Sequence, residues 1–362
     1  MRLNKGVVSS VVILSLILSL SSCTGYNYLT LKERLNKDKA KGHYIKGLDF
    51  KKQRRHLCGP AALASVLRFW GEDITQDDIA DKIYLSNIRG TLTFDLEDYA
   101  YDKGYFSQIS HSDIHTLGER IKQNIPVIVM HQIYPIIRKY HYLVVFGYDD
   151  TDDIILAYTG KEKPQVISYF HFMRKWKSAD YWMLVVCPPE KVNWELDAYY
   201  QNRLALLYER KGRLDKAKIN YEKAISKDKT EPTYYFNLGN IYMKEKDFDE
   251  AISLYKRVID LDSNFADAYN NLAFCLYEKS QDLDKAREYV DRAIELNPES
   301  RGYYLDTLGL ICLKQGDIDK AISLYKQALK SFDDGDKKAL SIIYEHLKVA
   351  LEARRKTQDY RK

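Results

Sequence analysis

The chain has 362 residues, of which 45% are hydrophobic and 30% are charged. This balance excludes a disordered chain and a multispan membrane protein, and the length indicates two domains, or one domain and a repeat array. The formal charge of +5 is too dilute over this length to indicate a nucleic-acid partner. Five cysteines are too few for a disulfide scaffold, and their odd number leaves at least one thiol to be explained.

The N-terminus has the charged, apolar and small-residue pattern of a secretory signal over residues 1–23. Arg2 and Lys5 come first, an apolar run follows over residues 7–20, and the segment ends in Leu-Ser-Ser-Cys at Cys23. This ending resembles the bacterial lipobox, in which the cysteine becomes the lipidated first residue of the mature protein. The alternatives are an uncleaved membrane anchor or a plain signal, and either also places the remainder outside the cytoplasm.

The resemblance to a lipobox implies a cell-envelope protein that is anchored to a membrane by lipid and faces the periplasm. Thr24 stands where an aspartate often retains such proteins in the inner membrane, so we expect the outer membrane. Residues 24–52 are polar and basic without a sustained apolar period, and we interpret them as a tether.

Short β-branched runs and helical periods alternate between residues 53 and 190, which predicts an α+β domain. The first predicted helix has Pro60 in its first turn and Gly71 after its last, as is typical of helix starts and stops. We expect helices over 60–70, 76–83, 94–103 and 112–123, and strands over 126–130, 142–146, 154–158 and 182–186.

Cys58 comes just before Pro60, so its thiol is expected at the N-terminus of the first helix. Exposed amides and the helix dipole stabilise a thiolate there, and the thiolate is the nucleophilic form of cysteine. Gln53 comes five residues earlier and can donate an amide hydrogen bond to an oxyanion beside the Cys58 backbone N–H. A base is also needed, and His141 stands out among the eight histidines because it opens a predicted strand.

The residues around Gln53, Cys58 and His141 resemble the papain-like, bacteriocin-processing cysteine peptidases that cleave leader peptides. The matching segments are Gln-x4-Cys-Gly-Pro-Ala-Ala at 53–62 and His-Tyr-x-Val-Val-x-Gly-Tyr-Asp at 141–149. The resemblance implies a papain-like fold in which Cys58 is the nucleophile, His141 the general base and acid, and Gln53 the oxyanion donor. It also implies hydrolysis of a peptide or protein substrate through an acyl-thioenzyme, without a cofactor.

The third catalytic residue of that family is an aspartate or asparagine on the strand that follows the histidine. Here that strand carries no carboxylate, so Thr159, Asp149, Asp153 or a water molecule is expected to orient the imidazole instead. An inactive peptidase fold that serves as an interaction scaffold is therefore an alternative function. A second alternative is a transferase that uses the same Cys-His pair to pass the acyl group to an amine.

Two other features of this segment suggest weaker sites. His111 and His115 can lie on one face of a helix, but no third ligand is spaced to join them, so we predict no metal site. Cys187 ends a predicted strand, and a disulfide between Cys187 and Cys58 would block the nucleophile.

From Trp194 onward the chain repeats itself. Ala217, Ala251, Ala286 and Ala321 recur at spacings of 34, 35 and 35 residues. This period, with helical spacing of apolar residues, is typical of tetratricopeptide repeats, in which each repeat is a pair of antiparallel helices. We expect an all-α tetratricopeptide solenoid of four repeats within residues 194–355, ending in a helix over 337–355. Much of the excess of tyrosine, 30 residues in all, is assigned to its core, as at Tyr221, Tyr255 and Tyr325.

The resemblance to tetratricopeptide proteins implies binding of a partner protein or peptide through a concave face. Asn237, Asn240, Asn270 and Asn271 are on predicted first helices, where their amides can line this face and bond to an extended backbone. The alternative is that these asparagines are merely solvated.

Overall fold

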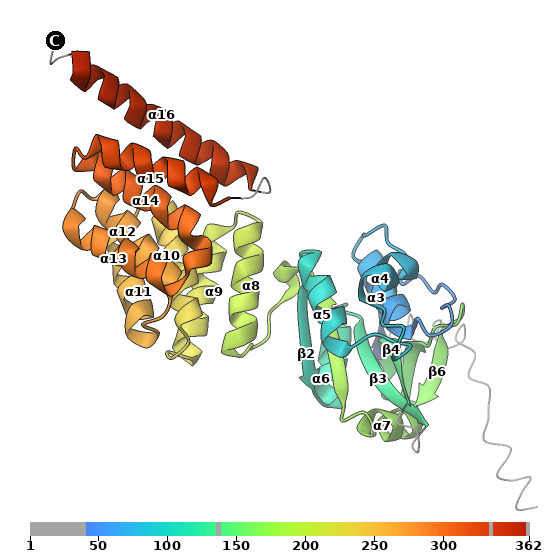
Figure 1. Cartoon of the computed structure of the whole chain (residues 1–362). Helices are drawn as coiled ribbons and strands as arrows, with labels where there is room; N and C mark the ends of the chain where they lie inside the picture. The colour runs from blue at the N-terminus through green and yellow to red at the C-terminus, as the bar shows by residue number, and fades with distance from the viewer. Residues whose placement is uncertain (1–40, 135–138, 333–335, 360–362) are drawn as a thin grey trace, which may run out of the picture. The chain divides into compact units, whose positions relative to one another are not determined.

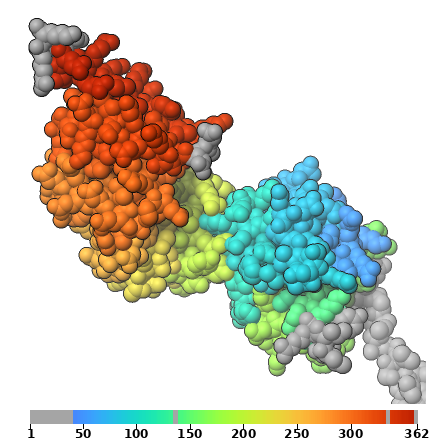
Figure 2. Space-filling model, in the orientation of Figure 1, coloured from blue at the N-terminus to red at the C-terminus, as the bar shows by residue number. Residues whose placement is uncertain are grey.

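The computed structural model describes residues 41–134, 139–332 and 336–359. The chain forms two compact units that divide between Asn193 and Trp194 (Figure 1, Figure 2). The predicted signal segment, with Cys23, lies outside the described residues, as does the predicted tether up to residue 40. Within the described ranges, no helix is long and apolar enough to cross a membrane.

The first unit is built on one antiparallel sheet. Its strand order is β2-β7-β3-β4-β5-β6, and β1 also pairs with β4. Strand β4 has partners on both sides and is buried from Tyr142 to Asp149. The strands span Gly42–Tyr44 (β1), Phe106–His111 (β2), Val127–Tyr134 (β3), Lys139–Asp149 (β4), Ile154–Tyr158 (β5), Gln165–Ser168 (β6) and Trp182–Cys187 (β7).

The four helices predicted for this unit are present, with ends within two residues of the expected ones. The first, α3, is buried from Gly59 to Leu67, which makes it the central helix of this unit. The second, α4, begins with a capping box in which Thr75 and Asp78 satisfy each other's backbone N–H. The helices span Cys58–Phe69 (α3), Gln76–Ile83 (α4), Thr93–Asp102 (α5), Ile114–Lys122 (α6) and Tyr169–Lys177 (α7).

The sequence did not predict strands β1, β2 and β6 or helix α7. The prediction that residues 24–52 form a tether is wrong at its C-terminal end, because β1 lies within it. Strand β3 pairs with β4 only as far as Val145, so the end of β4 has a free edge on that side. Strand β1 pairs with residues 147–149 of β4, and Ile45 and Leu48 are buried after it. Residues 41–52 therefore pack against the sheet, because the unpaired backbone groups of β4 need partners.

The second unit consists of helix pairs that follow one another in chain order, as in tetratricopeptide repeats (Figure 1). Four pairs and a final helix are described, as the sequence predicts. The helices span Ala198–Arg210 (α8), Leu214–Lys227 (α9), Pro232–Lys244 (α10), Phe248–Leu261 (α11), Ala266–Glu278 (α12), Leu283–Leu296 (α13), Arg301–Lys314 (α14), Ile318–Lys330 (α15) and Lys337–Asp359 (α16).

Glycines of the first helices leave room for tyrosines of the second helices. A Cβ added to Gly239 would lie 2.9 Å from the ring of Tyr255, and one added to Gly309 would overlap the ring of Tyr325. Both tyrosines are fully buried, as is Tyr221 of the first repeat. The predicted role of these three tyrosines in the repeat core is confirmed.

Substitution of Gly309 by alanine should destabilise the second unit by about 1–3 kcal/mol, because a fully packed ring must move to admit the methyl group. Urea unfolding followed by far-UV circular dichroism measures this change. Gly118→Ala in α6 is the control, since its added Cβ would lie 3.8 Å from Tyr148, an ordinary contact. That variant should be neutral or gain up to about 1 kcal/mol from helix propensity. Equal stability of the two variants would contradict the packing described.

Candidate active site

Cys58 is the first residue of α3 and is half-buried with a free thiol. The next residue, Gly59, has no room for a side chain, because an added Cβ would overlap Thr91 and lie 3.3 Å from the Tyr142 ring. The first turn of α3 is therefore packed against β4 at the residue that follows His141. This places the thiol at a helix N-terminus, as the sequence predicts.

His141 lies near the start of β4, and its Nε2 is 3.2 Å from the backbone oxygen of Thr159. A carbonyl only accepts, so Nε2–H donates to it and Nδ1 carries the lone pair in the neutral ring. Burial lowers the pKa of the His141 imidazole, and the positive charge of Lys175 lowers it further. The hydrogen bond to the Thr159 carbonyl raises this pKa, but by less than burial lowers it. The imidazole is therefore neutral at neutral pH.

Among the predicted orienting residues, Thr159 is the one that contacts His141, through its main-chain carbonyl. Its hydroxyl is buried without a hydrogen-bond partner. The expectation for Asp149 and Asp153 is wrong. Asp149 comes eight residues after His141 on the same strand, which separates their Cα atoms by roughly 26 Å. Asp153 leads into β5 at that same far end, where Ile154 pairs with Asp149.

Gln53 packs on Gly160, the residue after Thr159. The Gln53 N–H donates to the Gly160 carbonyl at 2.9 Å, and a Cβ added to Gly160 would overlap the Gln53 side chain. Gly160 has a φ of +80°, a left-handed conformation that favours glycine. Gln53 Oε1 is buried without a hydrogen-bond partner. A pocket of about 410 Å³ is lined by Lys52, Gln53, Thr159, Gly160, Lys161 and Glu162.

The contacts around the predicted catalytic residues form two groups. One runs from Gln53 through Gly160 to His141, and the other places Cys58 beside Tyr142. The groups meet at the peptide bond between residues 141 and 142 and along residues 53–58. No hydrogen bond joins Cys58 to His141 in the described chain, and catalytic hydrogen bonds often tighten only when substrate binds. Successive side chains of a strand point to opposite faces, so the packing of α3 on Tyr142 does not by itself bring the Cys58 thiol to the His141 ring, and no thiol–imidazole pair is assembled.

Exposed basic side chains gather around these two groups. Partial burial and neighbouring positive charges lower the pKa of His56, which lies two residues before Cys58. The acidic residue that lines the pocket is Glu162. The basic residues are Lys52 and Lys161 at the pocket, Arg55, Arg89 and Lys139 around His56, and Lys175 beside His141. The site is therefore electropositive, which the small formal charge of the chain does not reveal.

The prediction that His111 and His115 lie on one face of a helix is wrong. His111 ends β2, and its Nδ1 bonds to the backbone oxygen of Asp180 at 2.6 Å. His115 lies in α6, so the two histidines share no helical face. No group of three metal-ligating side chains occurs among the described residues.

Cys187 cannot form the disulfide considered for Cys58, and both thiols are free. Trp70, just after the end of α3, donates its indole N–H to the Val186 carbonyl at 2.8 Å. Cys58 begins the same helix, so it lies roughly 18 Å from that end, beyond the reach of a disulfide. Burial raises the pKa of the Cys187 thiol to about 12, which leaves it unreactive.

The four asparagines predicted to line the concave face are half-buried on α10 and α12. Asn237 Nδ2 donates to Asn202 Oδ1 of α8 at 3.1 Å, and Asn271 Nδ2 donates to Asn240 Oδ1 at 3.0 Å. Asn270 Oδ1 is buried without a hydrogen-bond partner. These amides therefore link successive first helices, a role that the repeat pattern does not predict, and ligand binding by them stays a prediction.

Family models match both units of the chain. Residues 45–181 match the Peptidase_C39 like family. Residues 205–246, 239–280 and 264–334 match models of the tetratricopeptide repeat. The chain therefore contains a Peptidase_C39-like domain followed by tetratricopeptide repeats. None of the curated proteins compared with the chain matches it significantly.

Several solved structures resemble part of the chain. The crystal structure of MamA is 25% identical, covers 37% of this chain and 77% of that chain, and has a TM-score of 0.34. The first tetratricopeptide domain of Spaghetti, bound to an HSP90 peptide, is 22% identical over 33% of this chain and 94% of that chain, with a TM-score of 0.32. A tetratricopeptide repeat protein from Parabacteroides merdae is 16% identical over 42% of this chain and 57% of that chain, with a TM-score of 0.38.

Sequence reasoning missed His131, which lies directly opposite His141 in the ladder of β3 and β4. The predicted strand ends at Met130, one residue too early to reveal this pair. The His131 ring contacts Phe172 of α7 with centroids 4.9 Å apart, and 6% of the residue is exposed. Its Nε2 is buried without a hydrogen-bond partner. Burial, with smaller effects of nearby positive charge, lowers the pKa of His131 to about 3.

This buried imidazole should make the first unit less stable in mild acid. Between pH 6.5 and about 3, the unfolded chain binds a proton that folded His131 does not bind, so stability falls as the pH falls. The loss from this one residue should reach about 1.4 kcal/mol per pH unit. His131→Phe should remove that part of the pH dependence.

Urea unfolding near neutral pH and near pH 5, followed by tryptophan fluorescence, measures the difference. Three of the four tryptophans, Trp70, Trp176 and Trp182, belong to the first unit. Acid-sensitive groups that do not contact His131 affect the wild type and the variant alike. The same change in unfolding free energy in both proteins would show that folded His131 titrates normally.

Proposed function

We propose that the first domain is a cysteine peptidase that hydrolyses peptide bonds through an acyl-thioenzyme. The observation that carries the proposal is the oriented imidazole. The Thr159 carbonyl accepts from Nε2–H of His141, which leaves the basic Nδ1 for the Cys58 thiol. The match of residues 45–181 to the Peptidase_C39 like family supports the same class of activity.

In the proposed acylation, Cys58 Sγ attacks the carbonyl carbon of the scissile peptide bond while His141 Nδ1 takes the thiol proton. A C–S bond forms, and the electron pair of the C=O bond moves to oxygen. The Cys58 backbone N–H, at the N-terminus of α3, and the Gln53 amide donate to this oxyanion. His141 then gives the proton to the amide nitrogen, the C–N bond breaks, and the amine product leaves.

In the proposed deacylation, a water molecule attacks the thioester carbonyl while His141 Nδ1 takes a proton from it. The tetrahedral intermediate breaks its C–S bond, the proton passes to Sγ, and the acid product leaves. The lowered pKa of His141 keeps the imidazole in the neutral form that both steps need. The Thr159 carbonyl keeps the ring in one orientation during both steps.

The tetratricopeptide array is proposed to recruit the substrate or a partner protein to the peptidase, which the repeat matches support. The lipobox-like sequence supports a lipid anchor at Cys23 that holds the chain on the periplasmic side of the outer membrane. Metabolic labelling with palmitate tests the anchor. Cys23→Ser should lose both the label and membrane fractionation, and retention of the label would contradict lipidation at this residue.

A thiol-reactive peptide electrophile should label Cys58 rapidly. Labelling should be roughly 100-fold slower in His141→Ala, because a positioned base contributes about that factor. Peptide mapping by mass spectrometry identifies the modified residue. Cys187 and Cys275 are internal controls that should stay unlabelled, since burial raises the pKa of each thiol to about 12.

A conservative variant separates the carbonyl from the side chain of Thr159. Thr159→Val keeps the main-chain oxygen and removes only an unpartnered hydroxyl, so its labelling rate should stay within about threefold of the wild type. Equally slow labelling in the wild type and His141→Ala would favour an inactive scaffold. Products that carry an added amine would identify acyl transfer in place of hydrolysis.

The basic side chains around the site predict a preference for acidic peptides. A substrate with Asp or Glu beside the scissile bond should have a kcat/KM about tenfold higher at low salt than its Asn/Gln counterpart, and the difference should vanish near 1 M salt. The double variant Arg55→Glu, Lys139→Glu should reverse the preference. Lys326→Glu, exposed on α15, is the matched control. Equal rates for both peptides at every salt concentration would rule out this preference.

A further inference from the structure

The final helix, α16, exposes a flank that the first helices of the complete repeats bury. In those repeats a small residue lies on the side that faces the second helix, and Gly309 leaves room there for Tyr325. The equivalent position of α16 is 35 residues further on and is occupied by Tyr344, which is 59% exposed. The small residues of the complete repeats are Ala205, Gly239, Ala273 and Gly309.

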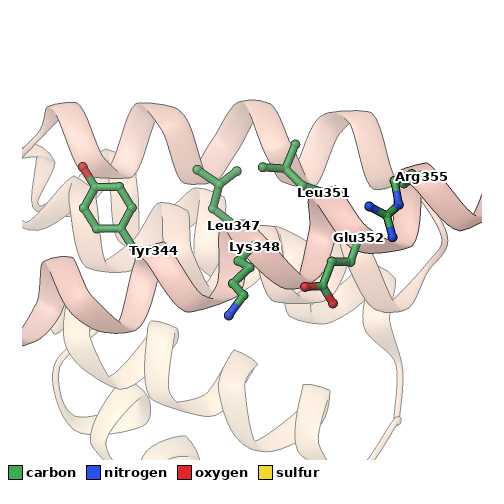
Figure 3. A pocket seen from close by; sticks show the side chains of 6 residues that line it. All are labelled: Tyr344, Leu347, Lys348, Leu351, Glu352 and Arg355. Atoms are coloured by element: carbon green, nitrogen blue, oxygen red, sulfur yellow. The ribbon is translucent and has the colours of Figure 1, made fainter.

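No second helix covers this flank in the described chain. Helix α16 packs on α14 and α15, with Ile343, Leu347 and Ala350 joining the core of the last repeats. The uncovered side forms a groove of about 360 Å³ that runs along roughly three helical turns (Figure 3). Its lining residues are Tyr344, Leu347, Lys348, Leu351, Glu352 and Arg355.

We propose that the same flank of a second copy of this chain covers the groove, with the two α16 helices antiparallel. A two-fold contact requires a surface that is complementary to itself. The six positions meet this requirement, because reversing the helix direction exchanges them in pairs. Tyr344 then lies opposite Arg355 of the second copy, Leu347 opposite Glu352, and Lys348 opposite Leu351.

Two of the three directly opposite pairs set a leucine against a charged residue, and the complementary contacts of these residues lie one position along the helix. The leucines at 347 and 351 of both copies form an apolar centre, and their spacing along the helix suits helix-to-helix packing. Lys348 comes within one position of Glu352 of the second copy, which allows two symmetric ion pairs. The Arg355 guanidinium meets the Tyr344 ring, a favourable cation–π geometry.

The charges on the flank favour a second copy over an acidic or basic partner. Lys348 and Arg355 are balanced in part by Glu352 on the same stripe, so a partner of one charge sign would meet repulsion. The contact of Lys348 with Glu345 on its own helix is long, at 3.8 Å, and exposed, so it competes little with a pair across the interface.

Sedimentation equilibrium of the full chain over a range of about 1–100 μM, where weak dimers dissociate, tests the proposal. The average mass should rise from that of the monomer toward twice that value as concentration increases. Leu351→Asp should weaken the dimer at least tenfold. Val349→Asp is the matched control, because Val349 is 54% exposed on the same helix but does not line the groove.

A charge exchange identifies the orientation of the two helices. Lys348→Glu and Glu352→Lys should each weaken the dimer, because each places like charges together, and the double variant should restore it. A monomer at every concentration would overturn the proposal. A dimer that Leu351→Asp leaves intact, or that the double variant fails to restore, would also overturn it. Circular dichroism of each variant verifies that α16 stays folded.

Discussion

The geometry of the first unit depends on the register of strand β4. This strand is paired on both sides and buried from Tyr142 to Asp149, and a slip of one residue would turn every side chain to the other face. The register therefore determines where His141 lies. The thiol reaches the same strand because α3 packs through Gly59 on Tyr142, and the Gln53 backbone is bonded to the turn after β5.

In the proposed site, a backbone carbonyl contacts the imidazole where the resemblance to bacteriocin-processing peptidases implies a carboxylate or amide side chain. The Thr159 carbonyl orients the imidazole of His141, but it carries no full negative charge to stabilise an imidazolium. Burial and the nearby Lys175 also disfavour the charged ring. For the proposed reaction, this environment suits a neutral imidazole that accepts a proton better than a permanent thiolate–imidazolium pair. The surrounding basic side chains also disfavour the charged ring, and under the proposed function they would favour substrates that carry negative charge.

The second unit follows a different constraint, because each repeat contacts chiefly its neighbours. Glycine or alanine on the first helix lets the second helix approach, and the asparagine pairs bond one first helix to the next. In this arrangement, each first helix that is followed by a second helix has its packing side covered by that helix. The last helix lacks one in the described chain, and Tyr344 occupies the position where Gly309 admits its neighbour. The uncovered flank of α16 is therefore where we expect a new contact surface.

The residue pattern was sufficient to predict the features that depend on neighbouring residues: the helix that begins at Cys58, the buried strand after His141, and the repeat period. Which distant groups meet became clear only from the folded chain. Strand β1 has three residues and forms because β3 leaves one edge of β4 unpaired. The Thr159 carbonyl could not be identified from sequence, because every residue carries a carbonyl and only the register of β4 and β5 selects this one. Local patterns encode periodicity and capping, whereas contacts between distant residues arise only when the sheet is assembled.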